Sequence, residues 1–111
     1  MTGGQMRTRQ AKPADYPAIS GVVDVWWGRP VLASLPRLFL DHFWRSSLVI
    51  DGRDGPVAFL IGILSPSDPQ RAYIHFAGVA PALRHGGLAR TMYEEFFDMA
   101  RADGRHVVSA V

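Results

Sequence analysis

The sequence contains no cysteine, which excludes disulfide bonds, thiolate metal sites and cysteine nucleophiles. It also has no apolar stretch near the roughly 20 residues that a membrane span needs, and no signal peptide is visible. Strong charge is missing too, since the formal net charge is +2 and no run of Lys or Arg marks a phosphate track. We therefore expect a cytoplasmic protein with no bound metal, no membrane contact and no nucleic-acid partner.

What is present fits one folded domain. The chain has 111 residues, of which 48% are hydrophobic and 20% are charged, and this balance is typical of a protein with a single compact core. Residues 1–6 resemble part of a common phage-derived epitope tag, so we expect them to lie outside the fold. Residues 7–111 are expected to form a single domain with one site.

The first half of the chain predicts a short strand followed by two helices. Residues 7–11 can form the strand, and a first helix should run from Pro13 until Gly28 closes it. The apolar stripe of this helix is Ile19, Val22, Val23, Trp26 and Trp27. A second helix should be capped by Ser34 and end near residues 46–47. Its expected apolar stripe is Leu35, Leu38, Phe39, His42 and Phe43.

Three strands are predicted next. Residues 48–50 and 57–64 should pair across the turn "DGRDG", where Gly52 and Gly55 can take the positive φ angles of a hairpin turn. The second of these strands is apolar throughout, so both of its faces should be covered. Residues 71–79 should form the third. Strict alternation along it predicts one face of Ala72, Ile74, Phe76 and Gly78 and an opposite face of Tyr73, His75, Ala77 and Val79.

The stretch "VAPALRHGGLARTMYEEFF", residues 79–97, passes from this strand directly into a helix. The first amides of a helix lack partners and the helix dipole adds positive charge, so the turn Arg84-His85-Gly86-Gly87-Leu88-Ala89 is suited to an anion. The spacing matches neither a P-loop nor the dinucleotide fingerprint. The helix should stop at residues 103–104 and lead to a last strand at 106–110. Its expected inner stripe is Leu88, Met92, Phe96 and Met99.

Residues 73–100 resemble the GCN5-related N-acetyltransferases, the GNAT family. The coenzyme A signature of that family is Arg or Gln, two residues, Gly, one residue, then Gly or Ala, and here Arg84, Gly87 and Ala89 stand at those positions. The order strand, two helices, three strands, helix, strand is also similar. The resemblance implies an α/β (α+β) fold with a mixed, mainly antiparallel sheet and helices on both faces. Against the family pattern, the chain lacks the C-terminal helix and two strands.

The resemblance also implies an N-acetyltransferase that moves an acetyl group from acetyl-CoA to a primary amine by direct attack. The pyrophosphate would lie on the turn and the pantetheine arm beside the strand, where Gly78 fits a bulge. A backbone amide near Phe76 or Ala77 would polarise the thioester carbonyl. The expected cofactor-binding residues are Phe76, Ala77, Gly78, Val79, Arg84, His85, Gly86, Gly87, Leu88 and Ala89.

The attacking amine, with a pKa near ~10.4, must lose a proton, so a base is needed. His75, on the strand face opposite Phe76, is the expected catalytic base, and the alternative is a histidine that is only buried or hydrogen-bonded. Aromatic residues of the first helix and the strand are expected to line the substrate pocket, with packing in the core as the alternative. They are Trp26, Trp27 and Tyr73.

In the family, the missing C-terminal helix commonly supplies a tyrosine that protonates the departing thiolate. Tyr93 lies on a different helix, so we assign no general acid. A second hypothesis is therefore a catalytically inactive acyl-CoA-binding fragment or an assembly module of the same fold. Because residues 106–111 would form an apolar edge strand, we also expect a homodimer.

Overall fold

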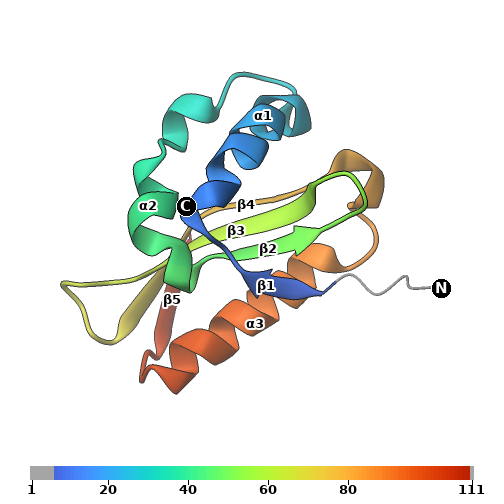
Figure 1. Ribbon diagram of the computed structural model, residues 1–111. Helices are drawn as coiled ribbons and strands as arrows, with labels where there is room; N and C mark the ends of the chain where they lie inside the picture. The colour runs from blue at the N-terminus through green and yellow to red at the C-terminus, as the bar shows by residue number, and fades with distance from the viewer. Residues whose placement is uncertain (1–6, 111) are drawn as a thin grey trace.

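The computed structural model describes residues 7–110, which form one sheet flanked by helices (Figure 1). The strands are β1 (Thr8–Gln10), β2 (Leu48–Asp51), β3 (Pro56–Leu64), β4 (Arg71–Val79) and β5 (Val107–Ala110). The helices are α1 (Tyr16–Trp27), α2 (Leu38–Phe43) and α3 (Leu88–Ala102), with short 3₁₀ helices at Pro13–Asp15, Leu32–Ser34, Trp44–Ser46 and Pro81–Leu83. The predicted tag, residues 1–6, lies outside the described residues.

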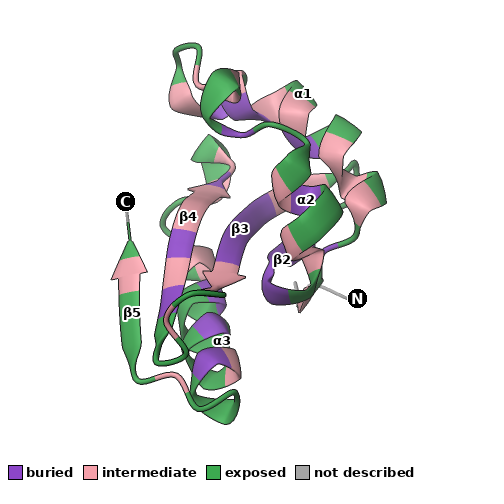
Figure 2. Ribbon diagram, turned by 90° about the vertical axis from the view of Figure 1, so that its left-hand side faces the viewer, coloured by how far each residue is buried: buried purple, intermediate pink, exposed green. Residues whose placement is uncertain are grey.

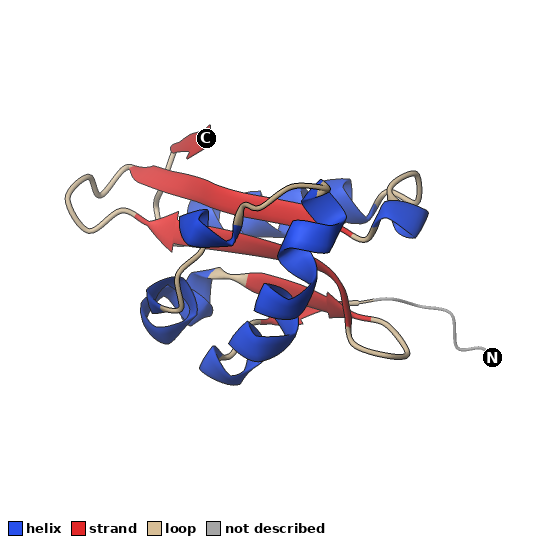
Figure 3. Cartoon of the chain, turned by 90° about the horizontal axis from the view of Figure 1, so that it is seen from above, coloured by secondary structure: helices blue, strands red, loops and turns tan. Residues whose placement is uncertain are grey.

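The strands lie side by side in the order β1-β2-β3-β4-β5. Neighbouring strands are antiparallel except β4 and β5, which are parallel. Helices α1 and α2 cover one face and α3 the other, as Figures 1 and 3 show. The predicted mixed, mainly antiparallel sheet with helices on both faces is confirmed. Among the helices of residues 7–110, none is both long and apolar enough to cross a membrane.

Two apolar clusters hold the layers together, one on each face of β3. The cluster under α3 includes Leu60 and Phe96, and the cluster under α1 and α2 includes Val23 and Phe59. As predicted for an apolar strand, β3 is buried along most of its length (Figure 2). The packing is tightest at Gly62, where a Cβ atom would lie 2.2 Å from the Phe96 ring.

The first helix is confirmed and the second differs from its prediction. Helix α1 ends at Gly28, which adopts a left-handed φ of 70° as a C-terminal cap should. Helix α2 is shorter than expected because it begins only at Leu38, and Ser34 caps nothing: it ends a separate 3₁₀ turn. The predicted stripe is wrong at Leu38, which is 47% exposed, and at His42, which is also exposed, and it omitted Leu40, which is fully buried.

The turn between β2 and β3 uses one of its two glycines in the predicted way. Gly55 has a φ of 138°, whereas Gly52 stays outside the positive-φ region. The Gly52 amide donates to the Gly55 carbonyl at 2.7 Å and closes the turn. The predicted hairpin is therefore confirmed and the predicted conformation of Gly52 is wrong.

The predicted alternation along β4 is wrong because the strand contains a bulge. Ile61 pairs with Phe76 but the next residue of β3, Gly62, pairs with Ile74, so His75 is an extra residue. The bulge predicted at Gly78 is wrong, because Gly78 pairs regularly with Phe59. The extra residue reverses the faces beyond it. Ala77 and Val79 therefore join Ala72 and Ile74 on the side of α3, while His75, Phe76 and Gly78 contact residues of α1 and α2.

Candidate functional site

The turn between β4 and α3 leaves a helix N-terminus uncapped. Gly87 precedes the helix with a left-handed φ of 79°, and no side chain caps the first turn. The amides of Arg84 and Gly86 already donate to the carbonyls of Pro81 and Leu83. Four amides of the turn therefore have no backbone hydrogen-bond partner within residues 7–110, so an anion could bind them. They belong to His85, Gly87, Leu88 and Ala89.

One edge of β4 is open next to this turn. The pairing of β4 with β5 ends at Ile74 and Ala110, so residues 75–79 have no β5 partner within the described chain. On the other edge, the Ala80 amide donates to Val57 of β3 at 2.8 Å. Because an antiparallel ladder alternates, the N–H and C=O groups of Ala77 and Val79 then point away from β3. They face the open edge.

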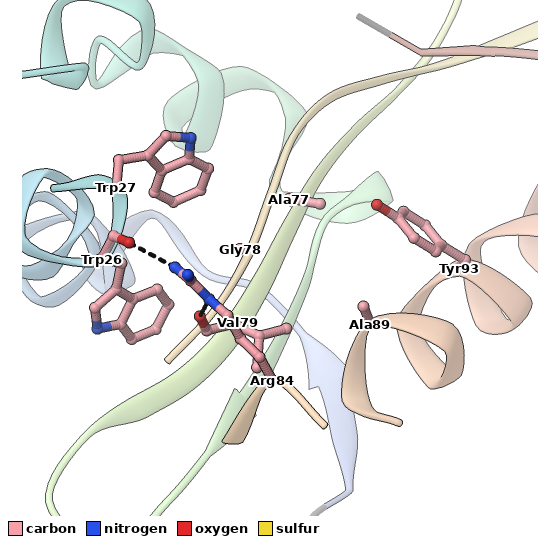
Figure 4. A pocket seen from close by; sticks show the side chains of 8 residues that line it. All are labelled: Trp26, Trp27, Ala77, Gly78, Val79, Arg84, Ala89 and Tyr93. Carbon is pink, nitrogen blue, oxygen red and sulfur yellow. Dashed lines mark hydrogen bonds between the residues drawn. The ribbon is translucent and has the colours of Figure 1, made fainter. Parts of the chain in front are cut away.

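A cavity of about 490 Å³ lies along this edge and reaches the turn. Its lining residues are Trp26, Trp27, Ala77, Gly78, Val79, Arg84, Ala89 and Tyr93 (Figure 4). The Arg84 guanidinium crosses it: Nη2 donates to the Trp26 carbonyl at 2.5 Å and Nε to the Val79 carbonyl at 3.3 Å. One of the outward-facing groups of β4 is thus already bonded to a cationic side chain of the turn.

A second cavity, of about 370 Å³, continues toward the middle of β4. It is lined by Trp27, Arg29, Ile74, His75, Phe76, Ala77, Tyr93 and Ala110. Trp27, Ala77 and Tyr93 line both cavities, so the two form one path. The path runs from the uncapped helix N-terminus, along the open edge of β4, to His75. An elongated anionic ligand fits such a shape.

A sequence model of the acetyltransferase (GNAT) family matches residues 15–111. The chain belongs to this family. No curated protein matches it in sequence, whereas many solved structures match its fold. The predicted family is confirmed, and the GNAT fold accounts for the strand, turn and helix that build the path.

Three solved GNAT-like structures illustrate the match. Diaminobutyrate acetyltransferase EctA from Paenibacillus lautus, with L-2,4-diaminobutyric acid and coenzyme A, is 19% identical to this chain, with a TM-score of 0.77. The match covers 98% of this chain and 67% of EctA. YncA, a putative acetyltransferase from Salmonella typhimurium with acetyl-CoA, is 21% identical with a TM-score of 0.72, covering 96% and 69%. N-acetylglutamate synthase from Neisseria gonorrhoeae, with coenzyme A and N-acetyl-glutamate, is 16% identical with a TM-score of 0.79, covering 97% and 26%. This chain therefore spans about a quarter of the third protein and about two thirds of the other two.

Within the GNAT fold, His75 stands at the inner end of the path. Its ring stacks on Phe39, with centroids 4.0 Å apart, and its Nε2 lies 2.8 Å from the Ser34 carbonyl. A carbonyl can only accept, so Nε2 carries the proton and Nδ1 is the basic nitrogen of the neutral ring. The predicted face is wrong, however, because His75 and Phe76 lie on the same side of the sheet, with ring centroids 6.1 Å apart.

The predicted pocket aromatics are only partly brought together. Trp27 lines both cavities and packs on Phe76, with centroids 4.7 Å apart. Trp26 is 8% exposed and stacks on Phe59, so its ring belongs mainly to the core. Tyr73 lines neither cavity; its ring lies 6.0 Å from that of His75.

Two lining residues were missed from the sequence, Tyr93 and Arg29. Tyr93 lines both cavities, and its hydroxyl end points toward Ala77 in Figure 4. A signal was available, because residue 93 follows Ala89 by one helical turn and shares its face. Arg29 follows Gly28 in the loop after α1, and nothing in the local pattern marks it.

Proposed function

We propose that residues 7–111 form one acetyl-CoA-binding domain that transfers the acetyl group of acetyl-CoA to a primary amine. The observation that carries this proposal is the single path that joins the uncapped N-terminus of α3 to His75 along the open edge of β4. Family membership supports the reaction type, and the similar structures named above hold coenzyme A or acetyl-CoA.

The turn binds the pyrophosphate in this proposal. The free amides of His85, Gly87, Leu88 and Ala89 donate to phosphate oxygens, and Gly86 keeps the backbone free of side chain at that point. Arg84 adds a positive charge. Its bonds to the Trp26 and Val79 carbonyls must break before the guanidinium can form paired bonds to phosphate.

The open edge of β4 binds the pantetheine arm and the thioester. Val79 and Ala77 offer their outward N–H and C=O groups, while Gly78 and Phe76 are directed to β3 and support the strand. Of the two amides considered from the sequence, the alternation favours Ala77 over Phe76 as the donor that polarises the carbonyl oxygen.

The chemistry proceeds by direct attack of the amine on the thioester carbon. The C–N bond forms, the C–S bond breaks, and the electron pair leaves with the sulfur of CoA. His75 accepts the amine proton at Nδ1. The sequence alone assigns no general acid, but Tyr93 lines both cavities and its hydroxyl end points toward Ala77 (Figure 4). In this proposal the thiolate takes a proton from Tyr93, and solvent returns a proton to this tyrosine, which is 37% exposed.

A homodimer is part of the same proposal, and so is a cytoplasmic location. The outer edge of β5 pairs with no strand within residues 7–110, and Val107 and Val108 on it are 41% and 36% exposed. Phe97 of α3 is 38% exposed as well. A second copy could pair with that edge and cover these side chains. Light scattering coupled to size-exclusion chromatography tests this, and a folded monomer of 12.2 kDa at micromolar concentration would contradict it.

Thiol release from acetyl-CoA, followed with pooled amino acids, peptides and polyamines, tests the transfer itself. We expect turnover in the wild type and a loss of about 10²-fold in His75→Gln, with CoA affinity unchanged. The matched control is His42→Gln, because His42 is an exposed histidine of α2 outside both cavities. CoA binding without thiol release from any acceptor would refute the transfer and support the inactive binding fragment instead.

A further inference from the structure

The second cavity contains one charged side chain, that of Arg29, and the first contains one, that of Arg84. No Asp or Glu among residues 7–110 lines either cavity. The remaining walls of the second cavity are aromatic or apolar apart from His75. Because Arg84 belongs to the turn that binds phosphate in the proposed function, Arg29 is the cationic side chain available to bind the acceptor amine substrate.

The loop that carries Arg29 is held at both ends. Gly28 ends α1 in a left-handed conformation. Three residues further on, Oδ1 of Asp24 accepts the amides of Val31 and Leu32 at 2.7 and 2.9 Å. The backbone around Arg29 is therefore held by α1 itself, and from it the exposed Arg29 side chain reaches the wall of the second cavity.

Arg29 has no partner of its own. It makes no hydrogen bond, ion pair or ring contact with any residue between 7 and 110. Arginines on the surface of this chain commonly do pair, as Arg90 does with Glu94 and Arg101 with Asp98. An unpaired guanidinium beside a cavity can bind a carboxylate through two parallel hydrogen bonds.

We propose that the acceptor amine carries a carboxylate, which Arg29 binds, on an apolar or aromatic body that packs against Trp27, Phe76 and Tyr93. The inference rests on the proposed acetyl transfer and names the class of its acceptor. An amino acid with an apolar side chain has these features. A polyamine or another polycation does not, because it would place extra positive charge beside Arg29 in a cavity that no Asp or Glu of residues 7–110 lines.

The test uses acetylated products, because they have no amine to titrate and can differ in one group only. N-acetyl-L-phenylalanine and N-acetyl-L-phenylalaninamide are titrated into the full chain saturated with CoA, by isothermal titration calorimetry at pH 7. The carboxylate should bind at least tenfold more tightly than the carboxamide. In Arg29→Gln the two affinities should agree within twofold.

The matched control is Arg53→Gln, which makes the same change of charge in the exposed β2–β3 turn, away from both cavities. It should keep the wild-type ratio. The proposal is overturned if the wild type binds both products equally or binds neither. It is also overturned if Arg29→Gln keeps the wild-type ratio.

Turnover separates this inference from the transfer on which it rests. Thiol release is compared for L-phenylalanine and spermidine as acceptors. Selective binding of the carboxylate product without thiol release would refute the proposed acetyl transfer but support the carboxylate site. Faster thiol release with spermidine than with L-phenylalanine, at a rate unchanged in Arg29→Gln, would support the acetyl transfer but refute the carboxylate site.

Discussion

Two glycines with the same left-handed φ flank α3 and provide a sharp test of the proposed phosphate-binding turn. Gly87 precedes the helix and Gly104 follows it, and both have a φ of 79° with open space where a Cβ would stand. Gly87 belongs to the proposed site, whereas Gly104 lies at the far end of the helix. Alanine at either position should therefore cost similar stability, and only one should affect the ligand.

The expected magnitudes follow from the conformation. A non-glycine residue in the left-handed region costs about 1–2 kcal/mol. For a domain near 100 residues, such a cost lowers the melting temperature by roughly 4 to 16 °C in both variants. CoA at ~100 times its dissociation constant should add about 2.7 kcal/mol to the unfolding free energy of the wild type and of Gly104→Ala.

In Gly87→Ala the new methyl group should keep phosphate away from the turn. If affinity falls tenfold, the same CoA concentration adds only about 1.4 kcal/mol. Urea unfolding without CoA measures the stability cost of each substitution, and urea unfolding with CoA measures the stabilisation by the ligand. The reasoning is refuted if the two variants gain the same stabilisation, or if the wild type gains none at millimolar CoA.

Two further predictions concern the path wall and the N-terminal ion pairs. Gly78→Ala should weaken CoA binding, because its Cβ would lie 2.6 Å from the Trp27 ring and push that ring into the cavities. Adding Trp27→Phe should restore binding in calorimetry; a double variant as weak as the single one would contradict this. Hydrogen bonds from Arg9 lower the pKa of Asp15 below 3.8, so this pair stabilises the fold above about pH 4 and loses its effect as the pH falls through the lowered pKa. Arg9→Gln should therefore lose unfolding free energy at pH 7 and approach the wild type below that pKa, and a gap independent of pH would refute the linkage.

The turn and α3 could be predicted because their causes are local. Met92 and Phe96 recur one helical turn apart, and both are fully buried. Gly87 stands where a left-handed residue starts the helix and Gly104 where one follows its end. These features depend on residues close together in the sequence, so the sequence pattern is sufficient to identify them.

The start of helix α2 and its buried face could not be predicted from the sequence in the same way. Its sequence satisfies a stripe through Leu38 as well as one through Leu40, and the choice depends on which side chain reaches the cluster under α1. Leu40 joins Val23 and Phe59 there, across more than 15 residues in either direction. Tertiary packing therefore selects between two patterns that the helix alone permits.

The bulge in β4 shows most clearly where alternation fails. It falls opposite Ile61 and Gly62, and at Gly62 the Phe96 ring and the Ser46 carbonyl both come so close that no side chain fits. These groups come from α3 and from the 3₁₀ helix before β2. A strict period of two cannot represent an extra residue, so every face beyond His75 was assigned the wrong way round.

That extra residue also explains why β4 can have two different functions. Before His75 the strand pairs with β5, and after it the outward groups of Ala77 and Val79 have no strand partner within residues 7–110. His75 lies between the part of β4 that pairs with β5 and the part whose outer edge is open. From the sequence, His75 is expected to be the catalytic base, with Phe76 on the opposite face of the strand. In the folded chain the bulge puts both rings on one side and brings His75 to the end of the path, where the proposed transfer would take place.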